Sequence, residues 1–167
     1  DMAIENMHFV PDDNVLELDA AIKSGSRNAV FNLFRYWLAW TYLRSLFSGV
    51  TPVTVWDMGC GCGYGSRIMA EQHPNVIVHA FAYDRDALLT AGRLYAHPNV
   101  QHHLMNLDGP WFDTGHVAAA AQQPLFRPDV VVCFELLEFL HNRDMFLLRV
   151  SRMLKLGGVL LLSMPFD

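Results

Sequence analysis

Short apolar runs alternate with longer amphipathic stretches from residue 53 to the end of the chain. The apolar runs have few polar interruptions, which is typical of parallel strands covered on both faces of a sheet. The alternation with helical stretches predicts right-handed βαβ units in a doubly wound, mostly parallel α/β sheet of about five strands. The predicted strands span 53–58, 76–83, 100–104, 130–134 and 159–164. The predicted helices span 64–72, 86–96, about 115–122 and 137–154, the last with a break near residues 141–142.

Residues 1–50 have a different pattern, which predicts a helical segment. Large apolar residues recur there near helical spacing and predict an amphipathic helix whose apolar face packs on the core. These residues are Phe31, Phe34, Trp37, Leu38, Tyr42 and Leu46. Gly49 and Pro52 are expected to end the helix. We therefore expect two parts, an N-terminal segment over 1–50 that caps the ligand site and an α/β domain over 51–167.

Composition and charge narrow the range of functions. The chain has 167 residues, 52% of them hydrophobic, and a formal net charge of −5. Its basic residues are scattered, which argues against nucleic-acid binding. Cys60, Cys62 and Cys133 form neither a disulfide framework nor a zinc spacing, so we expect a reducing cytoplasmic location and no metal site. No apolar run reaches the roughly 20 residues that a membrane span needs, because Asn32 and Arg35 interrupt the longest one.

Glycines at alternating positions follow the first predicted strand, at Gly59, Gly61, Gly63 and Gly65. Glycine has no Cβ, so the backbone can adopt positive φ and a ligand can approach it closely. A strand, a glycine turn and a helix in this order are typical of a site for a nucleoside-containing cofactor. A tight turn without a ligand is the alternative.

The spacing of these glycines disfavours a dinucleotide. The dinucleotide pattern Gly-x-Gly-x-x-Gly needs its third glycine at Tyr64 if it starts at Gly59, and at Ser66 if it starts at Gly61. A large tyrosine is unfavourable where strand and helix must pack closely. The turn also lacks the lysine of a phosphate-binding loop.

Acidic residues end the first two predicted strands. Asp84 lies about 20 residues after the glycines, where a carboxylate accepts hydrogen bonds from ribose hydroxyls. Capping of the following helix is the alternative, a role that we expect of Asp86 instead. Asp57 directly precedes the glycines and is expected to accept hydrogen bonds from amides of the turn, to attract a cationic ammonium group, or both.

Three longer stretches carry distinctive patterns: VWDMGCGCGYGS at 55–66, PDVVVCFELLE at 128–138 and RMLKLGGVLLLSMP at 152–165. In this order and spacing they resemble motifs of the class I S-adenosylmethionine-dependent methyltransferases. The likeness is to the bacterial branch with ubiquinone-biosynthesis-like and glycan-associated enzymes. Phe9-Val-Pro11 and Arg35-Tyr36 resemble its N-terminal signature. The resemblance covers most of the chain and implies a Rossmann-like methyltransferase fold with S-adenosyl-L-methionine as cofactor.

The resemblance also implies which residues bind the cofactor. They are Asp57, Gly59, Cys60, Gly61, Gly63, Asp84, Arg85, Asn106, Leu107, Phe134 and Arg35. The glycines would contact the methionine part and Asp84 the ribose. Arg85 would flank the adenine, beside the side-chain carbonyl of Asn106 and the backbone N–H of Leu107.

The methyl-transfer side of the site is implied to lie around Phe134 and Glu135, with Glu135 as the candidate catalytic base. Arg35 would reach the methionine carboxylate, with simple packing on a helix face as the alternative. Phe139 departs from the family branch, which often has histidine after the residue that matches Glu138, so one candidate base is absent.

The resemblance further implies two more strands after 159–164 in a full domain. The chain is accordingly expected to be a short form, a fragment, or a domain whose C-terminal sheet edge is covered by another copy or a partner chain. The function that we expect is transfer of a methyl group to a small-molecule or glycan-type acceptor. The alternatives are a non-catalytic domain that binds the cofactor or a partner, and an enzyme that cleaves S-adenosylmethionine.

Overall fold

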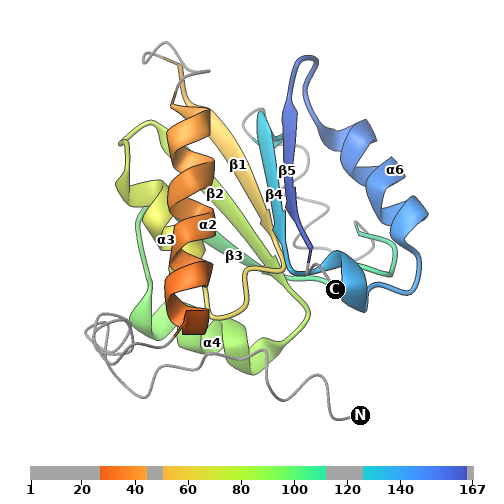
Figure 1. Cartoon of the computed structure of the whole chain (residues 1–167), viewed down its shortest axis with the longest axis horizontal. Coiled ribbons are helices and arrows are strands. Elements are labelled where there is room, and N and C mark those ends of the chain that lie inside the picture. The colour runs from red at the N-terminus through yellow and green to blue at the C-terminus, as the bar shows by residue number, and fades with distance from the viewer. Residues whose placement is uncertain (1–26, 45–50, 112–125, 165–167) are drawn as a thin grey trace.

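A parallel five-stranded sheet forms the centre of the computed structural model, which describes residues 27–44, 51–111 and 126–164 (Figure 1). The strands are β1 (Val53–Met58), β2 (Val76–Ala82), β3 (Val100–Leu104), β4 (Val130–Phe134) and β5 (Val159–Ser163). Their order is β3-β2-β1-β4-β5, and every neighbouring pair is parallel. The predicted sheet is confirmed. Because the order reverses between β1 and β4, the carboxyl ends of these two strands flank the topological switch point, where such sheets bind ligands.

Helices cover both faces of the sheet, as expected for a doubly wound fold. They are α2 (Arg27–Leu43), α3 (Tyr64–Glu71), α4 (Arg85–Leu94), the short 3-10 helix η1 (Leu137–Phe139) and α6 (Arg143–Met153). Side chains of α2 and α3 pack on one face, and side chains of η1 and α6 pack on the other. The predicted break near residues 141–142 is confirmed, since it separates η1 from α6. The helix predicted at about 115–122 lies outside the described residues.

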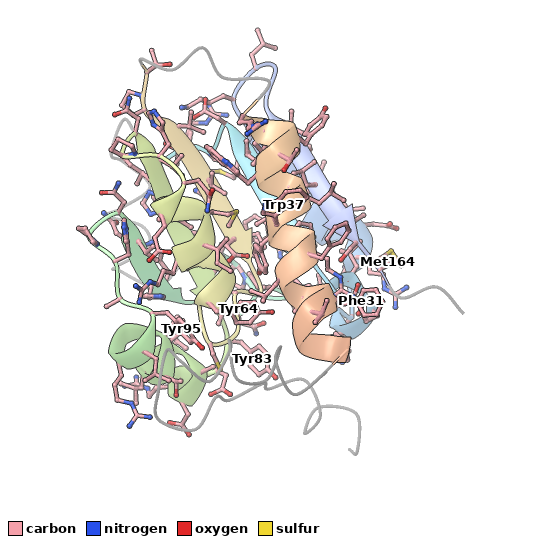
Figure 2. The ribbon with its side chains drawn as sticks, turned by 60° about the vertical axis from the view of Figure 1, so that its left-hand side comes forward. Phe31, Trp37, Tyr64, Tyr83, Tyr95 and Met164 are labelled. Atoms are coloured by element: carbon pink, nitrogen blue, oxygen red, sulfur yellow. The ribbon has the colours of Figure 1, made fainter. Side chains whose placement is uncertain are left out.

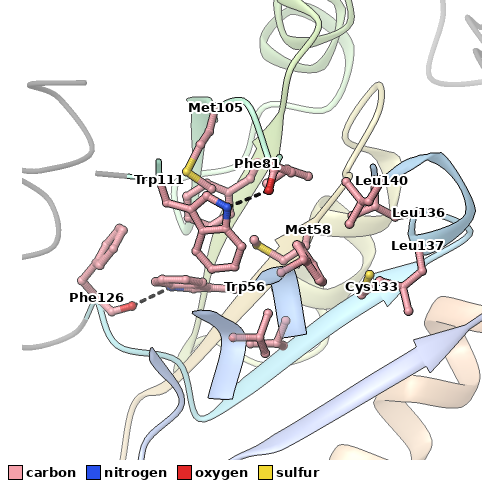
Figure 3. Packing of buried hydrophobic residues seen from close by; sticks show 14 residues of the cluster. Trp56, Met58, Phe81, Met105, Trp111, Phe126, Cys133, Leu136, Leu137 and Leu140 are labelled. Atoms are coloured by element: carbon pink, nitrogen blue, oxygen red, sulfur yellow. Dashed lines mark hydrogen bonds between the residues drawn. The ribbon is translucent and has the colours of Figure 1, made fainter. Parts of the chain in front are cut away.

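An aromatic cluster fills the core on the side of α6 (Figure 3). Trp56 of β1 is fully buried, and its indole N–H donates a hydrogen bond of 2.7 Å to the carbonyl oxygen of Phe126. The indole N–H of Trp111 donates likewise to the carbonyl oxygen of Leu107, at 2.9 Å. Each buried indole therefore satisfies its one donor while it contributes a large apolar surface. The bond from Trp56 ties the entry to β4 to the central strand β1, and the bond from Trp111 is made within the segment after β3.

The predicted packing face of α2 is wrong. The predicted residues Phe31, Phe34, Trp37, Leu38 and Tyr42 are between 49% and 59% exposed, and Figure 2 shows Phe31 and Trp37 on this helix. Leu46 and Gly49 lie outside the described residues. The buried stripe consists of Tyr36, Ala39 and Leu43. Its position follows from close contact with α3, because the Tyr36 ring lies against Gly65, where a Cβ would come within 2.0 Å of the ring.

β3 and β5 are the outer strands of the sheet among the residues that the structure describes. Coverage of the β5 edge by another copy or a partner chain stays a prediction, as does the division of the chain at residue 50. In the described ranges, no helix combines the length and apolar character that crossing a membrane requires.

Candidate functional site

The glycine turn after β1 has the backbone conformation that its sequence predicts. Gly59, Gly61 and Gly63 have φ values of 85°, 52° and 83°, in the region that favours glycine. A Cβ on Gly61 would meet no atom within 4 Å, so open space adjoins the turn there. A Cβ on Gly63 would lie 2.7 Å from the Cβ of Ala91 in α4. Gly61 therefore leaves room for a ligand, whereas Gly63 allows close packing of the turn on α4.

A buried carboxylate lies beneath this turn, at the end of β1. Asp57 is 1% exposed, and each of its oxygens accepts a hydrogen bond from a hydroxyl group. The Tyr36 hydroxyl donates to Oδ1 at 3.2 Å, and the Ser66 hydroxyl donates to Oδ2 at 2.6 Å. Burial raises the pKa of Asp57 to about 6, although both hydrogen bonds act to lower it. Two neutral donors thus offset only part of the desolvation of this charge.

Amides of the turn bind backbone carbonyls rather than Asp57, contrary to one of the two expected roles of that residue. The N–H groups of Gly59 and Cys60 donate to the Phe81 carbonyl oxygen at 2.9 and 3.0 Å. The Gly63 N–H donates to the Cys60 carbonyl oxygen at 2.9 Å. The physical reason is that the turn continues the pairing of β1 with β2. Burial raises the pKa of the Cys60 thiol well above its usual value, so this side chain is an uncharged part of the packing.

Asp84 follows β2 and caps α4. Its Oδ1 accepts hydrogen bonds from the N–H groups of Asp86 and Ala87, at 2.8 and 3.4 Å. The prediction that Asp86 is the cap is wrong, because α4 begins at Arg85 and places Asp86 inside its first turn. The position of Asp84 at the carboxyl end of the strand next to β1 is as predicted, and its bond to ribose stays a prediction.

The residues expected around the adenine lie after β2 and β3. Arg85 is exposed at the start of α4. Asn106 is exposed and its side-chain carbonyl accepts a hydrogen bond of 3.0 Å from the Asp108 N–H. The side chain of Leu107 is buried in the aromatic core. The structure thus places these residues at the carboxyl end of the sheet, and their contacts with adenine stay predictions.

Glu135 begins the connection after β4 in an unusual conformation. Its φ is 50°, the one positive value recorded for a non-glycine residue in the described ranges. Its N–H donates to the Ser163 carbonyl oxygen at 3.1 Å, and its Oε1 accepts from the Ser163 hydroxyl at 3.0 Å. The same oxygen lies 3.3 Å from Nη2 of Arg35. A non-glycine residue held in this region costs of order 1 kcal/mol, and such strain is concentrated at functional sites.

The comparisons with known proteins agree with this arrangement. A family model described as methyltransferase domain matches residues 11–167. The chain belongs to this family. The resemblance to class I S-adenosylmethionine-dependent methyltransferases is thereby confirmed. No curated protein matches the chain.

Solved structures of other methyltransferases share the fold of this methyltransferase domain. The plantazolicin methyltransferase BpumL, crystallised with a desmethylplantazolicin analogue and S-adenosylhomocysteine, has a TM-score of 0.59 and 19% identity over 81% of this chain and 49% of its own. Coclaurine N-methyltransferase, bound to N-methylheliamine and S-adenosylhomocysteine, has a TM-score of 0.58 and 18% identity over 76% of this chain and 35% of its own. The StiE O-methyltransferase segment has a TM-score of 0.53 and 18% identity, over 66% and 37%. The chain therefore spans about half or less of these proteins.

Two consecutive residues of α2 connect the methyltransferase domain's acidic strand ends. The Tyr36 ring lies against Gly65, and its hydroxyl donates a hydrogen bond to Asp57. The same ring packs edge-on against Phe134, with centroids 5.1 Å apart. Arg35 pairs with Glu135. Sequence reasoning did not find the hydroxyl of Tyr36 as a partner of Asp57. The available signal was Gly65, a glycine inside the first turn of a helix, which indicates close approach of another side chain.

Proposed function

We propose that this methyltransferase domain binds S-adenosylmethionine at the glycine turn and transfers its methyl group to a small-molecule or glycan-type acceptor. One observation carries the proposal. The open space at Gly61 adjoins the turn that follows the buried Asp57 carboxylate, at the switch point of a doubly wound sheet. The proposal is supported by two relatives of the same fold that were crystallised with S-adenosylhomocysteine.

The chain's own residues fit such a cofactor by their chemistry. Asp57 supplies negative charge for the methionine ammonium group, and Arg35 supplies positive charge for its carboxylate. Asp84 accepts hydrogen bonds from the ribose at the end of β2. Asn106 and the backbone N–H of Leu107 hold the adenine edge, and Arg85 flanks its ring.

Methyl transfer itself places modest demands on the protein. The cofactor supplies a methyl group on a sulfonium that is already an activated leaving group. The protein therefore needs to orient the acceptor and exclude water. Phe134 lines the acceptor side, and Glu135 takes the proton that the acceptor nucleophile releases when its new bond to carbon forms.

Calorimetric titration with S-adenosylhomocysteine and with NAD tests the binding part of this proposal. We expect binding of S-adenosylhomocysteine and none of NAD, and the reverse would overturn the assignment. Asp84→Asn sharpens the test, because asparagine caps helices as well as aspartate but lacks one carboxylate oxygen. We expect this variant to bind S-adenosylhomocysteine about tenfold more weakly, from the loss of a charge-assisted hydrogen bond. Asp86→Asn, which removes the same charge two residues away, is the control and should leave the affinity unchanged.

The family branch often has histidine where this chain has Phe139, so one candidate base is absent. This difference favours a second candidate, a domain that binds the cofactor without transferring its methyl group. Turnover separates the two, and it is followed as release of S-adenosylhomocysteine over a panel of amine, hydroxyl and glycan acceptors. Binding without release from any acceptor would favour the non-catalytic reading. Formation of 5′-methylthioadenosine without an acceptor would instead indicate that the cofactor is cleaved.

A further inference from the structure

Arg35 has partners on both of its terminal nitrogens. Nη1 donates a hydrogen bond of 2.8 Å to Oδ1 of Asn32, one turn earlier in α2, and Nη2 lies 3.3 Å from Oε1 of Glu135. A guanidinium group binds a carboxylate most strongly through two parallel N–H donors. Each terminal nitrogen has two N–H groups, so a second carboxylate can also bind there, but it then lies beside the Glu135 carboxylate and shares one positive charge with it.

Arg35 belongs to the part of α2 that packs beside the glycine turn, since the ring of the next residue, Tyr36, lies edge-on to the Tyr64 ring with centroids 5.7 Å apart. Tyr64 is the first residue of α3 and directly follows Gly63. Burial and the nearby Asp57 raise the pKa of Tyr64, and the positive charge of Arg35 acts against them and lowers it. The next residue of α2, Tyr36, reaches Asp57 itself. The methionine end of a cofactor bound at the turn would thus lie within reach of Arg35.

The ion pair between Arg35 and Glu135 has the geometry of an exchangeable contact. Its separation of 3.3 Å exceeds the 2.7–2.9 Å typical of a strong charge-assisted hydrogen bond. The two side chains are 29% and 25% exposed, so solvent screens their attraction. Glu135 would also keep a partner after Arg35 moved, because the Ser163 hydroxyl donates to the same carboxylate oxygen. Neither residue would be left as an unpaired buried charge.

We propose that the carboxylate of Glu135 and the carboxylate of the cofactor compete for Arg35. This inference rests on the proposed function. Binding of S-adenosylmethionine exchanges one carboxylate for the other on the guanidinium group. The exchange leaves Glu135 held by Ser163 and takes the positive charge of Arg35 away from the carboxylate that accepts the acceptor's proton, which makes that carboxylate a stronger base. Glu135 is in this respect a positioning residue, since it sets the cofactor's affinity through Arg35.

The competition predicts that removing the charge of Glu135 tightens cofactor binding. We would measure the Kd of S-adenosylhomocysteine and of 5′-methylthioadenosine, which lacks the amino-acid carboxylate, by calorimetry at one ionic strength. Glu135→Gln should lower the Kd of S-adenosylhomocysteine about two- to fivefold, the range expected from release of a partly exposed ion pair. The same variant should leave the Kd of 5′-methylthioadenosine unchanged. Glu71→Gln removes the same charge from another arginine–glutamate pair, with Arg67, and should alter neither Kd.

A double-mutant cycle separates competition for Arg35 from a general change in electrostatic potential. Arg35→Gln should weaken S-adenosylhomocysteine about tenfold, and Glu135→Gln should have no further effect in that background. Unchanged or weaker binding by Glu135→Gln alone would overturn the inference. So would an equal gain for both ligands, or a gain that persists without Arg35. Failure of the wild-type chain to bind S-adenosylhomocysteine would instead overturn the proposed function, and the inference with it.

Discussion

Asp57 lies near the carboxyl end of β1 and Glu135 directly follows the neighbouring strand β4. Consecutive residues of α2 bind them, yet their surroundings differ. Asp57 is 1% exposed and is held by two neutral hydroxyl groups. The Glu135 side chain is 25% exposed and lies beside the charged Arg35. Burial without a countercharge raises the pKa of Asp57 to about 6. The difference shows that one side of the switch point is fixed by close packing, whereas the other is held by a contact that solvent weakens.

The fixed side depends on Gly65, and replacing this residue should have the largest effect. A Cβ at this position would lie 2.0 Å from the Tyr36 ring, so Gly65→Ala must displace the ring and with it a donor to Asp57. We expect a loss of about 3 kcal/mol in the free energy of unfolding, at the upper end for overpacking. Urea denaturation measures it. Gly92→Ala is the matched control, because a Cβ there meets nothing within 4 Å. It should stabilise the helix by about 0.5–1 kcal/mol, and an equal loss in both variants would contradict this account.

The buried charge of Asp57 should make stability depend on pH. Its pKa in the folded state, about 6, is above the ordinary value of 3.8 for an aspartate, so the folded state binds the proton more tightly. The stabilising contribution is fully present below pH 4 and is lost as the pH rises through 6. The loss amounts to up to about 3 kcal/mol, at 1.36 kcal/mol for each pKa unit.

Asp57→Asn removes this dependence while it keeps a side chain that both hydroxyl groups can bond. We expect the variant to be more stable than the wild type at pH 8, and the gap to close toward pH 4. Urea denaturation at four pH values tests this. Glu71→Gln, which removes a carboxylate from the exposed pair with Arg67, is the control and should show no such pH-dependent difference in stability from the wild type. A gap that is constant from pH 8 to pH 4 would show that the folded pKa is not raised. The same variant should bind S-adenosylhomocysteine more weakly, because the negative charge that attracts the ammonium group is gone.

A smaller change is expected from Tyr36→Phe, which keeps the ring and removes one donor to Asp57. Loss of a buried hydrogen bond to a charged group should cost about 1.5–3 kcal/mol at pH 8, and we expect the lower value because the 3.2 Å bond is long. The pKa of Asp57 should rise above 6, since this bond lowers it. Carbon-13 NMR titration of the carboxyl group reads the pKa directly. Tyr83→Phe, at a side chain that is 58% exposed, should change neither quantity, and an unmoved titration in Tyr36→Phe would count against the bond.

The sequence alone predicted the sheet and the Asp57 side of the switch point. The strands were predictable because buried parallel strands are apolar almost throughout, and the glycine turn was predictable because positive φ excludes most other residues. Asp57 and Asp84 were correctly placed at strand ends because the apolar runs that precede them mark the strands. The cap lies two residues earlier than predicted, at Asp84 instead of Asp86, because α4 begins at Arg85.

The packing of α2 and the Glu135 side of the switch point required tertiary structure. The large apolar residues of α2 predicted the wrong packing face, because the buried face is selected by Gly65 and Asp57, which lie far along the chain. The contact of Arg35 with Glu135 depends on β4 lying next to β1, which the order of elements along the chain does not specify. The positive φ of Glu135 was not predictable from the sequence, because glycine is the residue that indicates such a conformation and this position holds a glutamate.

Backbone conformation gives the smallest and most specific test of the difference between the two acidic residues. Glu135→Ala and Glu135→Gly both remove the carboxylate, so their difference in stability isolates the backbone. At a φ of 50°, alanine retains the cost of the left-handed region and glycine does not. We expect the glycine variant to be more stable by about 1 kcal/mol. The order should reverse for Asp57→Ala and Asp57→Gly, because Asp57 lies within strand β1, where glycine is the weaker residue. Urea midpoints of the four variants at pH 8 measure both orders. An alanine variant at 135 as stable as its glycine counterpart would mean that Glu135 has an ordinary backbone, and that only its side-chain contacts distinguish it from Asp57.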